Sequence, residues 1–376
     1  MSGAGGREEQ ALLARLLGGL VPAHPGARGL YHLTLNPRCN RLRVATAAGL
    51  SMRQVAEVLG VQVREGQSVF ALDRGIRFEE RLYESGAARL LELFRTERGW
   101  PVADCRVLDL RDVAPLPGGS AEAAATGLAR RAAATQRALA AKAAGDPHAY
   151  NLLVQPVLLI QVVGVAYPII PDLLAASSAE PFYTPGEVKS FPDRGSKTDP
   201  ADVAAATRQA AVAMVGLRQW AAAAPQPARL VGTQAHLVFA RPGSLQPTLH
   251  TQSVRHEVAV LDRALAAAPA DLRDVAAALP PDATLADPAT LEELPTCYRE
   301  VCRTFCPLAE PCKAQAIAAA SPVLLGTAAT GELAGISDLR RAAALLFGDA
   351  TPTPEETATV GRLRADLARD RRARCA

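Results

Sequence analysis

The middle of the chain changes character abruptly, and this change constrains the fold more than any other feature. Residues 118–147 are rich in alanine and punctuated by arginines, which predicts a long helix. Residues 154–174 and 182–191 are rich in β-branched residues, as central strands are. Residues 200–222 return to an alanine-rich, helical composition. Strands set between long helices predict an α/β fold with a central mixed sheet and flanking helices.

The composition excludes a membrane protein. The 376 residues suffice for a substantial core, and 41 basic against 38 acidic residues give a net charge of +3, so any basic surface must be local. No run approaches the roughly 20 apolar residues of a membrane helix; the longest candidate, 154–165, is interrupted by two glutamines and a proline. Glu8 and Glu9 lie where a signal peptide would carry basic residues. We therefore expect a cytoplasmic protein.

Two acidic residues and a lysine form a candidate catalytic site. Asp172 follows a proline, and after fourteen residues come Glu187, Val188 and Lys189. Side chains alternate along a strand, so Glu187 and Lys189 project from the same face. If Asp172 ends the neighbouring strand of a hairpin, its carboxylate can meet Glu187 across the ladder. Converging carboxylates suit Mg²⁺ or Mn²⁺, which can generate a hydroxide for attack on a phosphodiester.

Lysine is rare in this chain, and its use at position 189 is therefore informative. Only four of the 41 basic residues are lysines. The pKa of an ammonium can fall on burial, a property that arginine lacks, so Lys189 would orient the attacking water or help to deprotonate it. The alternative interpretation is that Glu187 and Lys189 form an ordinary exposed ion pair on an edge strand.

Four of the seven cysteines are clustered near the C-terminus. They lie within 16 residues: Cys297, Cys302, Cys306 and Cys312. The gaps of four, three and five residues do not form the two matched knuckles that are typical of zinc sites. Thiolates close together indicate a soft metal or an iron–sulfur cluster. The alternative is that these cysteines are unligated residues on a helix.

The acidic pattern resembles the signature of the PD-(D/E)XK nuclease superfamily, and its surroundings resemble the RecB-like branch. The segment from Gly75 to Glu79 is similar to the first motif of that branch, a helix that begins with glycine and presents a histidine or glutamate to the metal. Gln209 stands where the family has a DNA-contacting Q-x-x-x-Y motif, with Ala213 in place of the tyrosine. The resemblance implies that Glu79, or Glu80 one residue later, joins Asp172 and Glu187 in binding the metal.

The cysteine run resembles that of RecB-like nucleases with a 4Fe–4S cluster, such as CRISPR adaptation exonucleases and AddB-type subunits of helicase-nucleases. In those families one cysteine upstream of the first nuclease motif completes the cluster. Cys39 is in the matching place. The resemblance implies ligation by Cys39, Cys302, Cys306 and Cys312, with Cys297 as an alternative, and an iron–sulfur cap that joins the N- and C-terminal parts of the chain.

The resemblance covers roughly residues 30–320 and implies a restriction-endonuclease-like core. It divides the chain into a helical part with Cys39 and the first motif, the nuclease core, the cysteine cap and a helical tail: 1–95, 96–260, 261–325 and 326–376. The implied function is Mg²⁺- or Mn²⁺-dependent DNA hydrolysis, as an exonuclease on single-stranded ends. The setting would be DNA repair, recombination or antiviral defence, beside a helicase or defence-complex partner.

Two other functions remain open from the sequence alone. One is a catalytically inactive iron–sulfur subunit that binds DNA or acts as a scaffold. The other is a zinc-stabilised interaction protein.

Several residues and segments carry weaker expectations. Residues 29–35 alternate as a short strand would. His236 lies among apolar residues and is expected to be structural, and Cys105 is expected in the core. Three aromatic residues fit either the core or stacking on unpaired bases: Tyr167, Tyr183 and Trp220.

Overall fold

The computed structural model describes residues 4–24, 26–63, 69–114, 121–163, 165–224, 231–325 and 327–375. The chain forms two compact units. Unit 1 comprises Met1–Ala14, Pro22–Thr34 and Glu65–Ala270, and unit 2 comprises Arg15–Val21, Leu35–Arg64 and Asp271–Ala376. The four-part division predicted from the sequence stays a prediction.

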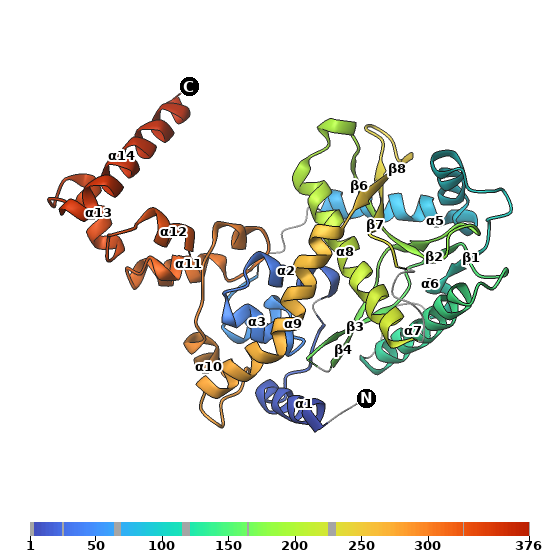
Figure 1. Cartoon of the computed structure of the whole chain (residues 1–376), viewed down its shortest axis with the longest axis horizontal. Coiled ribbons are helices and arrows are strands. Elements are labelled where there is room, and N and C mark those ends of the chain that lie inside the picture. Colours follow the sequence, from blue (N-terminus) through green and yellow to red (C-terminus); the bar gives the residue numbers. More distant parts are fainter. Residues whose placement is uncertain are drawn as a thin grey trace. The chain divides into compact units, whose positions relative to one another are not determined.

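The elements follow one another along the chain as shown in Figure 1. The helices are α1 (Ala4–Leu17), α2 (Gly26–Leu35), α3 (Asn40–Ala47), α4 (Met52–Val58), α5 (Val69–Arg98), α6 (Leu110–Val113), α7 (Ala121–Ala143), α8 (Pro200–Ala223), α9 (Arg255–Ala278), α10 (Pro288–Glu293), α11 (Ala309–Ala318), α12 (Thr327–Glu332), α13 (Leu339–Phe347) and α14 (Pro354–Cys375), with 3₁₀ turns η1 (Gly195–Lys197), η3 (Glu300–Thr304) and η4 (Val323–Leu325). The strands are β1 (Val107–Asp109), β2 (Leu152–Val154), β3 (Leu158–Val162), β4 (Val165–Ile169), β5 (Leu173–Ala175), β6 (Thr184–Pro192), β7 (Gln234–Ala240) and β8 (Pro247–Ser253).

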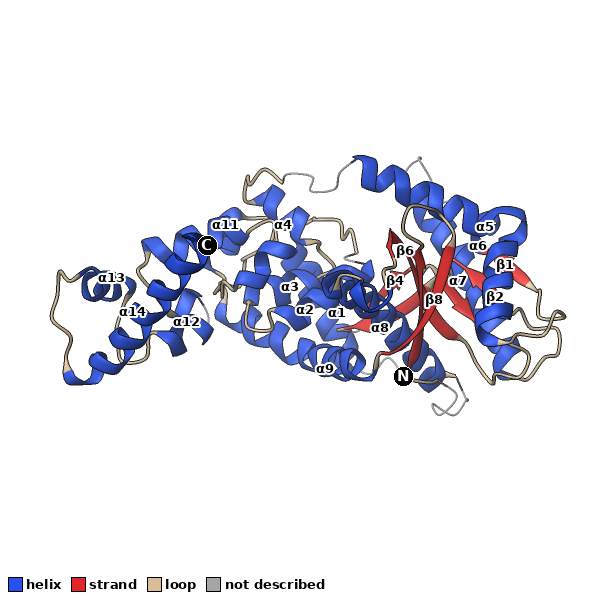
Figure 2. Cartoon of the chain, turned by 90° about the horizontal axis from the view of Figure 1, so that it is seen from above, coloured by secondary structure: helices blue, strands red, loops and turns tan. Residues whose placement is uncertain are grey.

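Unit 1 contains a six-stranded mixed sheet, which confirms the predicted α/β class. The strand order is β1-β2-β5-β6-β7-β8. The β1–β2 and β6–β7 pairs are parallel, and the other three pairs are antiparallel. Helices α5 and α8 pack against β6, and the strands are gathered among helices in Figure 2. The alanine-rich segments predicted as helices are α7 and α8.

One hydrophobic core of unit 1 lies between α5 and one face of this sheet. Phe78, Leu82 and Phe94 of α5 pack with Leu173 and Val188 of the central strands, and all are at least nine-tenths buried. Burial of each such side chain contributes on the order of 1.5–3 kcal/mol. The alternate strand residues are buried as well, so both faces of the sheet are covered.

The strands β3 and β4 form a separate two-stranded sheet, although the sequence predicted central strands throughout 154–174. The burial pattern of β3 alternates, with Leu159 and Gln161 exposed. Its buried side packs on α8 at Gly216, where a Cβ would lie 3.2 Å from the Cβ of Leu158. The missing side chain therefore allows the close approach of α8 to β3.

The prediction of a strand at residues 29–35 is wrong, because this segment lies in the helix α2. Leu30 and Leu33 are both buried, together with Tyr31. A spacing of three residues between buried leucines is compatible with one face of a helix, and that periodicity outweighs the short alternation. The strand β8 was not predicted, because its residues are mostly polar and exposed.

The single-residue expectations have mixed outcomes. His236 is buried, and its ring lies edge-on to Phe94 with centroids 5.1 Å apart, so it is a structural residue. Tyr167 and Tyr183 are buried in the core. Trp220 stacks on Phe182 with centroids 5.3 Å apart. Cys105 is exposed, so its expected place in the core is wrong. No helix in the described ranges has both the length and the apolar character needed to cross a bilayer.

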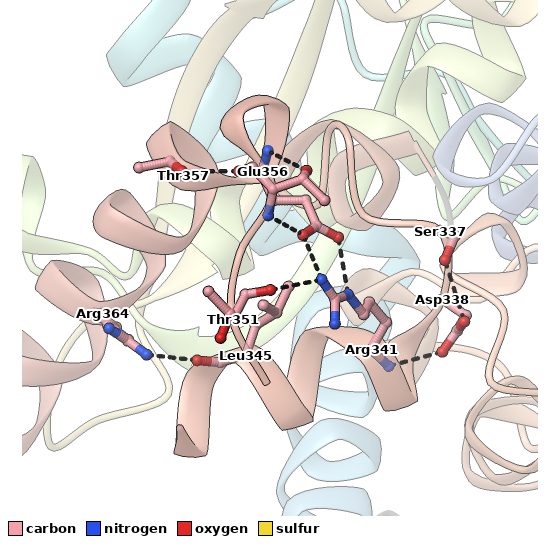
Figure 3. A network of polar contacts seen from close by, with 9 residues as sticks. Ser337, Asp338, Arg341, Leu345, Thr351, Glu356, Thr357 and Arg364 are labelled. Carbon is pink, nitrogen blue, oxygen red and sulfur yellow. Dashed lines mark hydrogen bonds and ion pairs between the residues drawn. The ribbon is translucent and has the colours of Figure 1, made fainter. Parts of the chain in front are cut away.

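In unit 2, a two-pronged ion pair fastens α13 to the start of α14 (Figure 3). Arg341 donates through Nη2 to Glu356 Oε2 at 2.7 Å and through Nε to Oε1 at 3.0 Å. Glu356 Oε2 also accepts a hydrogen bond from the backbone N–H of Thr353 at 2.8 Å, as in a capping box. Leu345 and Val360 pack in the small core between these helices. Helix α14 thus begins at Pro354, directly after Thr353.

We expect the packing of α13 on α14 to weaken in acid. The hydrogen bonds from Arg341 lower the pKa of Glu356 from 4.5 to about 2. A carboxyl whose pKa is lower in the folded state stabilises the fold above its unfolded pKa and loses this effect as the pH falls. Amide hydrogen exchange of residues 339–375, corrected for intrinsic rates, should therefore accelerate between about pH 4.5 and pH 2. The variant Glu356→Gln should remove this dependence and the exposed neighbour variant Glu355→Gln should keep it; equal profiles would contradict the assignment.

Candidate active site and cysteine cluster

The structure brings Asp172, Glu187 and Lys189 of unit 1 together. Asp172 directly precedes β5, and Leu173 pairs with Gly186 of β6 in antiparallel register. Lys189 Nζ lies 2.5 Å from Glu187 Oε2 and 3.5 Å from Asp172 Oδ2. Asp172 Oδ2 also accepts a hydrogen bond from the backbone N–H of Val188 at 2.7 Å. Asp172 precedes its strand instead of ending it, but the register still sets its carboxylate beside Glu187.

Gly186 makes this register sterically feasible. A Cβ at this position would lie 2.5 Å from Leu173 Cδ1 and 2.9 Å from Leu173 Cγ, far inside normal contact. Leu173 is fully buried and has little room to retreat. Only glycine therefore allows the two strands to pack with Asp172 opposite Glu187. In the sequence, the glycine directly before Glu187 is the feature that could have indicated this close packing of the two strands.

The charges at the site are incompletely balanced. Burial raises the pKa of Glu187, and the neighbouring carboxylate of Asp172 raises it further. Burial lowers the pKa of Lys189, but Glu187 and Asp172 outweigh that effect and the pKa is raised overall. This direction is opposite to the lowered pKa that the rarity of lysine suggested. With both carboxyls ionised, two closely set carboxylates share one ammonium and the site has excess negative charge, which is why the pKa of Glu187 is raised. Its oxygen donors fit a hard divalent cation, which would favour the ionised form of both acids.

Glu79, and not Glu80, is the helix carboxylate that belongs to this site. Glu79 is half-buried on α5, whereas Glu80 is exposed. Burial raises the pKa of Glu79, and Asp172 raises it further, so the two carboxylates lie within electrostatic range. Glu79 and Lys189 line the same cavity of about 260 Å³, the other lining residues being Arg28, Leu72, Gly75, Ile76, Phe78, Val188 and Ser190.

Two residues that hold the site in place were not predicted from the sequence. The hydroxyl of Tyr83 donates to the backbone carbonyl of Asp172 at 3.2 Å. Arg111 lies over the Tyr83 ring, 4.6 Å from its centroid, and its Nη2 is 2.6 Å from Asp109 Oδ2. Tyr83 follows Glu79 by four residues in α5, so helical spacing could have placed both on one face. The contact of Arg111 depends on the tertiary fold.

Gln209 lies outside this group of residues. It is half-buried on α8, does not line the cavity, and has no hydrogen-bond partner in the part of the chain that the structure describes. Ala213, at the place of the family's tyrosine, is 1% exposed and faces the core. The DNA contact proposed for Gln209 stays a prediction.

Unit 2 brings the predicted cysteines together. Cys39 is the N-cap of α3, Cys302 lies in η3, and Cys312 lies in the first turns of α11. Burial raises the pKa of Cys306 to about 12, with further contributions from Cys312, Cys39 and Cys302. Burial likewise raises the pKa of Cys312 to about 11, partly opposed by Arg41. These four thiols therefore lie within electrostatic reach of one another.

Cys297 lies on the edge of this group. Its pKa is raised by burial and then by Cys39 and Cys302. Cys297 is half-buried, as are Cys39, Cys306 and Cys312, whereas Cys302 is buried against Tyr298 and Ala309. The choice of Cys39, Cys302, Cys306 and Cys312, with Cys297 as an alternative, stays a prediction.

Two buried polar side chains donate hydrogen bonds to the sulfurs, and neither was predicted. Asn36 is 1% exposed, and its Nδ2 donates to Cys302 Sγ at 3.2 Å. Arg41 is 4% exposed, and its Nη1 donates to Cys312 Sγ at 3.7 Å while Nε donates to the carbonyl of Leu291 at 2.8 Å. In the described ranges Arg41 has no carboxylate partner. A buried guanidinium requires negative charge nearby, which a thiolate supplies and a neutral thiol does not.

The side chains as they stand do not form a finished metal site. Among the described residues, no group of three or more His, Cys, Asp or Glu side chains could hold a metal ion. At the acidic site the ammonium of Lys189 contacts both carboxylates, so metal binding requires these side chains to rearrange. The chain matches no protein-family model, no curated protein and no solved structure.

We expect Gly186→Ala to lower the free energy of unfolding by about 1–3 kcal/mol, as overpacking of a core does. The matched control is Gly75→Ala on α5, where the added Cβ would lie 3.8 Å from Ser190 Oγ in ordinary contact. Alanine is favoured over glycine in a helix by about 1 kcal/mol, so this variant should be neutral or stabilised. Urea unfolding of the two variants makes the comparison. Equal stability would contradict the close approach of β5 and β6 at Gly186.

Proposed function

We propose that this protein is a Mg²⁺- or Mn²⁺-dependent nuclease that hydrolyses phosphodiester bonds of DNA, with a restriction-endonuclease-like core in unit 1. The observation that carries the proposal is the meeting of Asp172, Glu187 and Lys189 on β5 and β6. The half-buried carboxylate of Glu79 beside the same cavity adds a third oxygen donor.

The residues of the chain have distinct roles in this proposal. Asp172, Glu187 and Glu79 would hold the divalent ion, which when bound lowers the pKa of a water and offsets charge on the phosphate. The Val188 amide orients the carboxylate of Asp172, and Tyr83 fixes its backbone. The raised pKa keeps Lys189 protonated, so it acts as a cation toward the phosphate or the attacking water.

The cysteines of unit 2 would hold a 4Fe–4S cluster through Cys39, Cys302, Cys306 and Cys312. The buried guanidinium of Arg41 at Cys312 Sγ is the main support, because it calls for anionic sulfur. Hydrogen bonds already join the two ends of this unit, from Asn36 to the carbonyl of Cys297 at 2.6 Å and from Asn40 to that of Pro295 at 3.2 Å. A cluster there would act as a structural cap that joins the N- and C-terminal segments.

A second candidate function is a catalytically inactive iron–sulfur subunit that binds DNA or acts as a scaffold. The observation that favours it is the buried Ala213, which leaves α8 without the family's DNA-contacting tyrosine. In either case we propose a cytoplasmic role in DNA repair, recombination or antiviral defence, with a helicase or defence-complex protein as partner.

We expect Asp172→Asn to reduce Mn²⁺-dependent hydrolysis of labelled DNA by about a hundredfold or more. Removing one group that stabilises charge in the transition state typically lowers the rate by about 10² to 10³. The control Asp282→Asn makes the same chemical change at an exposed residue of unit 2 and should leave the rate unchanged. Equal rates for wild type and Asp172→Asn, or no cleavage by wild type with either ion, would reject the nuclease in favour of the inactive subunit.

The cluster proposal predicts iron and sulfide in protein purified without oxygen. Cys306→Ser should lose the iron, whereas Cys105→Ser, an exposed thiol outside the group, should retain it. Arg41→Met should retain the cysteines but lose iron faster to a chelator, since the charge beside Cys312 is gone. Elemental analysis and visible absorbance provide the measurements. Stoichiometric zinc in place of iron would support the interaction protein instead.

A further inference from the structure

One arginine lines the cavity beside Glu79 and Lys189 but has no role in the proposed hydrolysis. Arg28 comes from α2, is exposed, and lines the cavity together with Glu79 and Lys189. Within the part of the chain that the structure describes, its guanidinium has no hydrogen bond and no ion pair. The cavity therefore contains a cation whose charge is available to a ligand.

A second arginine extends this positive region away from the cavity. Arg208 of α8 lies over the ring of Tyr31, with its Cζ 5.5 Å from the centroid. Arg28 and Arg208 both act on His32: burial lowers the pKa of His32 to about 4, and the two guanidiniums contribute to this lowering. The imidazole is neutral at physiological pH, and Arg208 has no carboxylate partner among the described residues. Arg28 and Arg208 thus form a positive region in which neither guanidinium has an ion pair with a described residue.

Part of the cavity lining is apolar. Leu72 and Ile76 follow one another by four residues on α5 and are 48% and 57% exposed, although both line the cavity. Gly75 between them has no side chain to narrow the space. A cavity lined by exposed apolar side chains and by a guanidinium without an ion pair fits a ligand with one apolar face and one anionic group.

We propose that Arg28 binds a phosphate of the DNA strand next to the phosphodiester that is cut, while Leu72 and Ile76 contact the base of the same nucleotide. This inference rests on the proposed nuclease function. The planar guanidinium can give two hydrogen bonds to a phosphate, which positions the strand. The base must be unpaired to lay its face on Leu72 and Ile76, because in a duplex that face is stacked and enclosed.

The test measures binding apart from cleavage. The full-length protein is titrated in EDTA against a fluorescein-labelled oligothymidine, and fluorescence anisotropy gives the Kd at several salt concentrations. Arg28→Ala should raise the Kd about tenfold, as expected for a charged hydrogen bond. It should also lower the slope of log K against log salt by about 0.7, the value for one phosphate contact on a single strand. Arg28→Lys should restore the slope and part of the affinity.

The matched control is Arg137→Ala on α7, an exposed arginine outside the cavity. Equal Kd and salt slope for Arg28→Ala and Arg137→Ala would overturn the assignment of Arg28, and so would a wild type that does not bind the strand. Ile76→Asp should weaken binding of the single strand more than binding of the same strand in a duplex, and an equal loss would overturn the apolar contact. Binding that depends on Arg28 without cleavage in Mn²⁺ would reject the nuclease proposal alone.

Discussion

The antiparallel pairing of β5 with β6 is the contact on which the acidic site depends. The register of Leu173 with Gly186 places Asp172 beside Glu187, and the amide of Val188 then binds the carboxylate of Asp172 at 2.7 Å. The same pairing directs Val188 into the core beneath α5. One strand pair thus links the stability of unit 1 to the geometry of its carboxylates, because any shift in register would move both.

The two candidate sites have opposite charge imbalances. In unit 1, the carboxylates of Asp172 and Glu187 share a single ammonium. In unit 2, the buried guanidinium of Arg41 faces a sulfur and no carboxylate in the described ranges. Uncompensated buried charge is costly, so each site favours a bound group of the opposite sign. A divalent cation would balance the excess negative charge of the first site, and an anionic thiolate cluster would balance the positive charge at the second.

Local periodicity made part of this structure predictable. The alternation of a strand was enough to put Glu187 and Lys189 on one face, and the alanine-rich segments were enough to give α7 and α8. Short segments were harder to predict. Residues 29–35 fit both the period of a strand and the period of a helix, and the polar edge strand β8 has no alternation of apolar residues. Four unpredicted residues act mainly through contacts between positions 28 to 271 apart in the chain: Tyr83, Arg111, Asn36 and Arg41. The bond of Arg111 to Asp109 is the exception, at two positions. No spacing rule predicts such distant contacts.

The raised pKa of Lys189 gives a reason for lysine that differs from the one its rarity suggested. A carboxyl buried as deeply as Glu187 needs a nearby cation whenever it is ionised. Lys189 supplies it here through one compact ammonium that reaches both Glu187 and Asp172. On the proposed function, a divalent ion would take over this compensation, and the flexible stem would leave the ammonium free to face the phosphate. The rigid fork of arginine, bound to a carboxylate by two hydrogen bonds, is less suited to such an exchange.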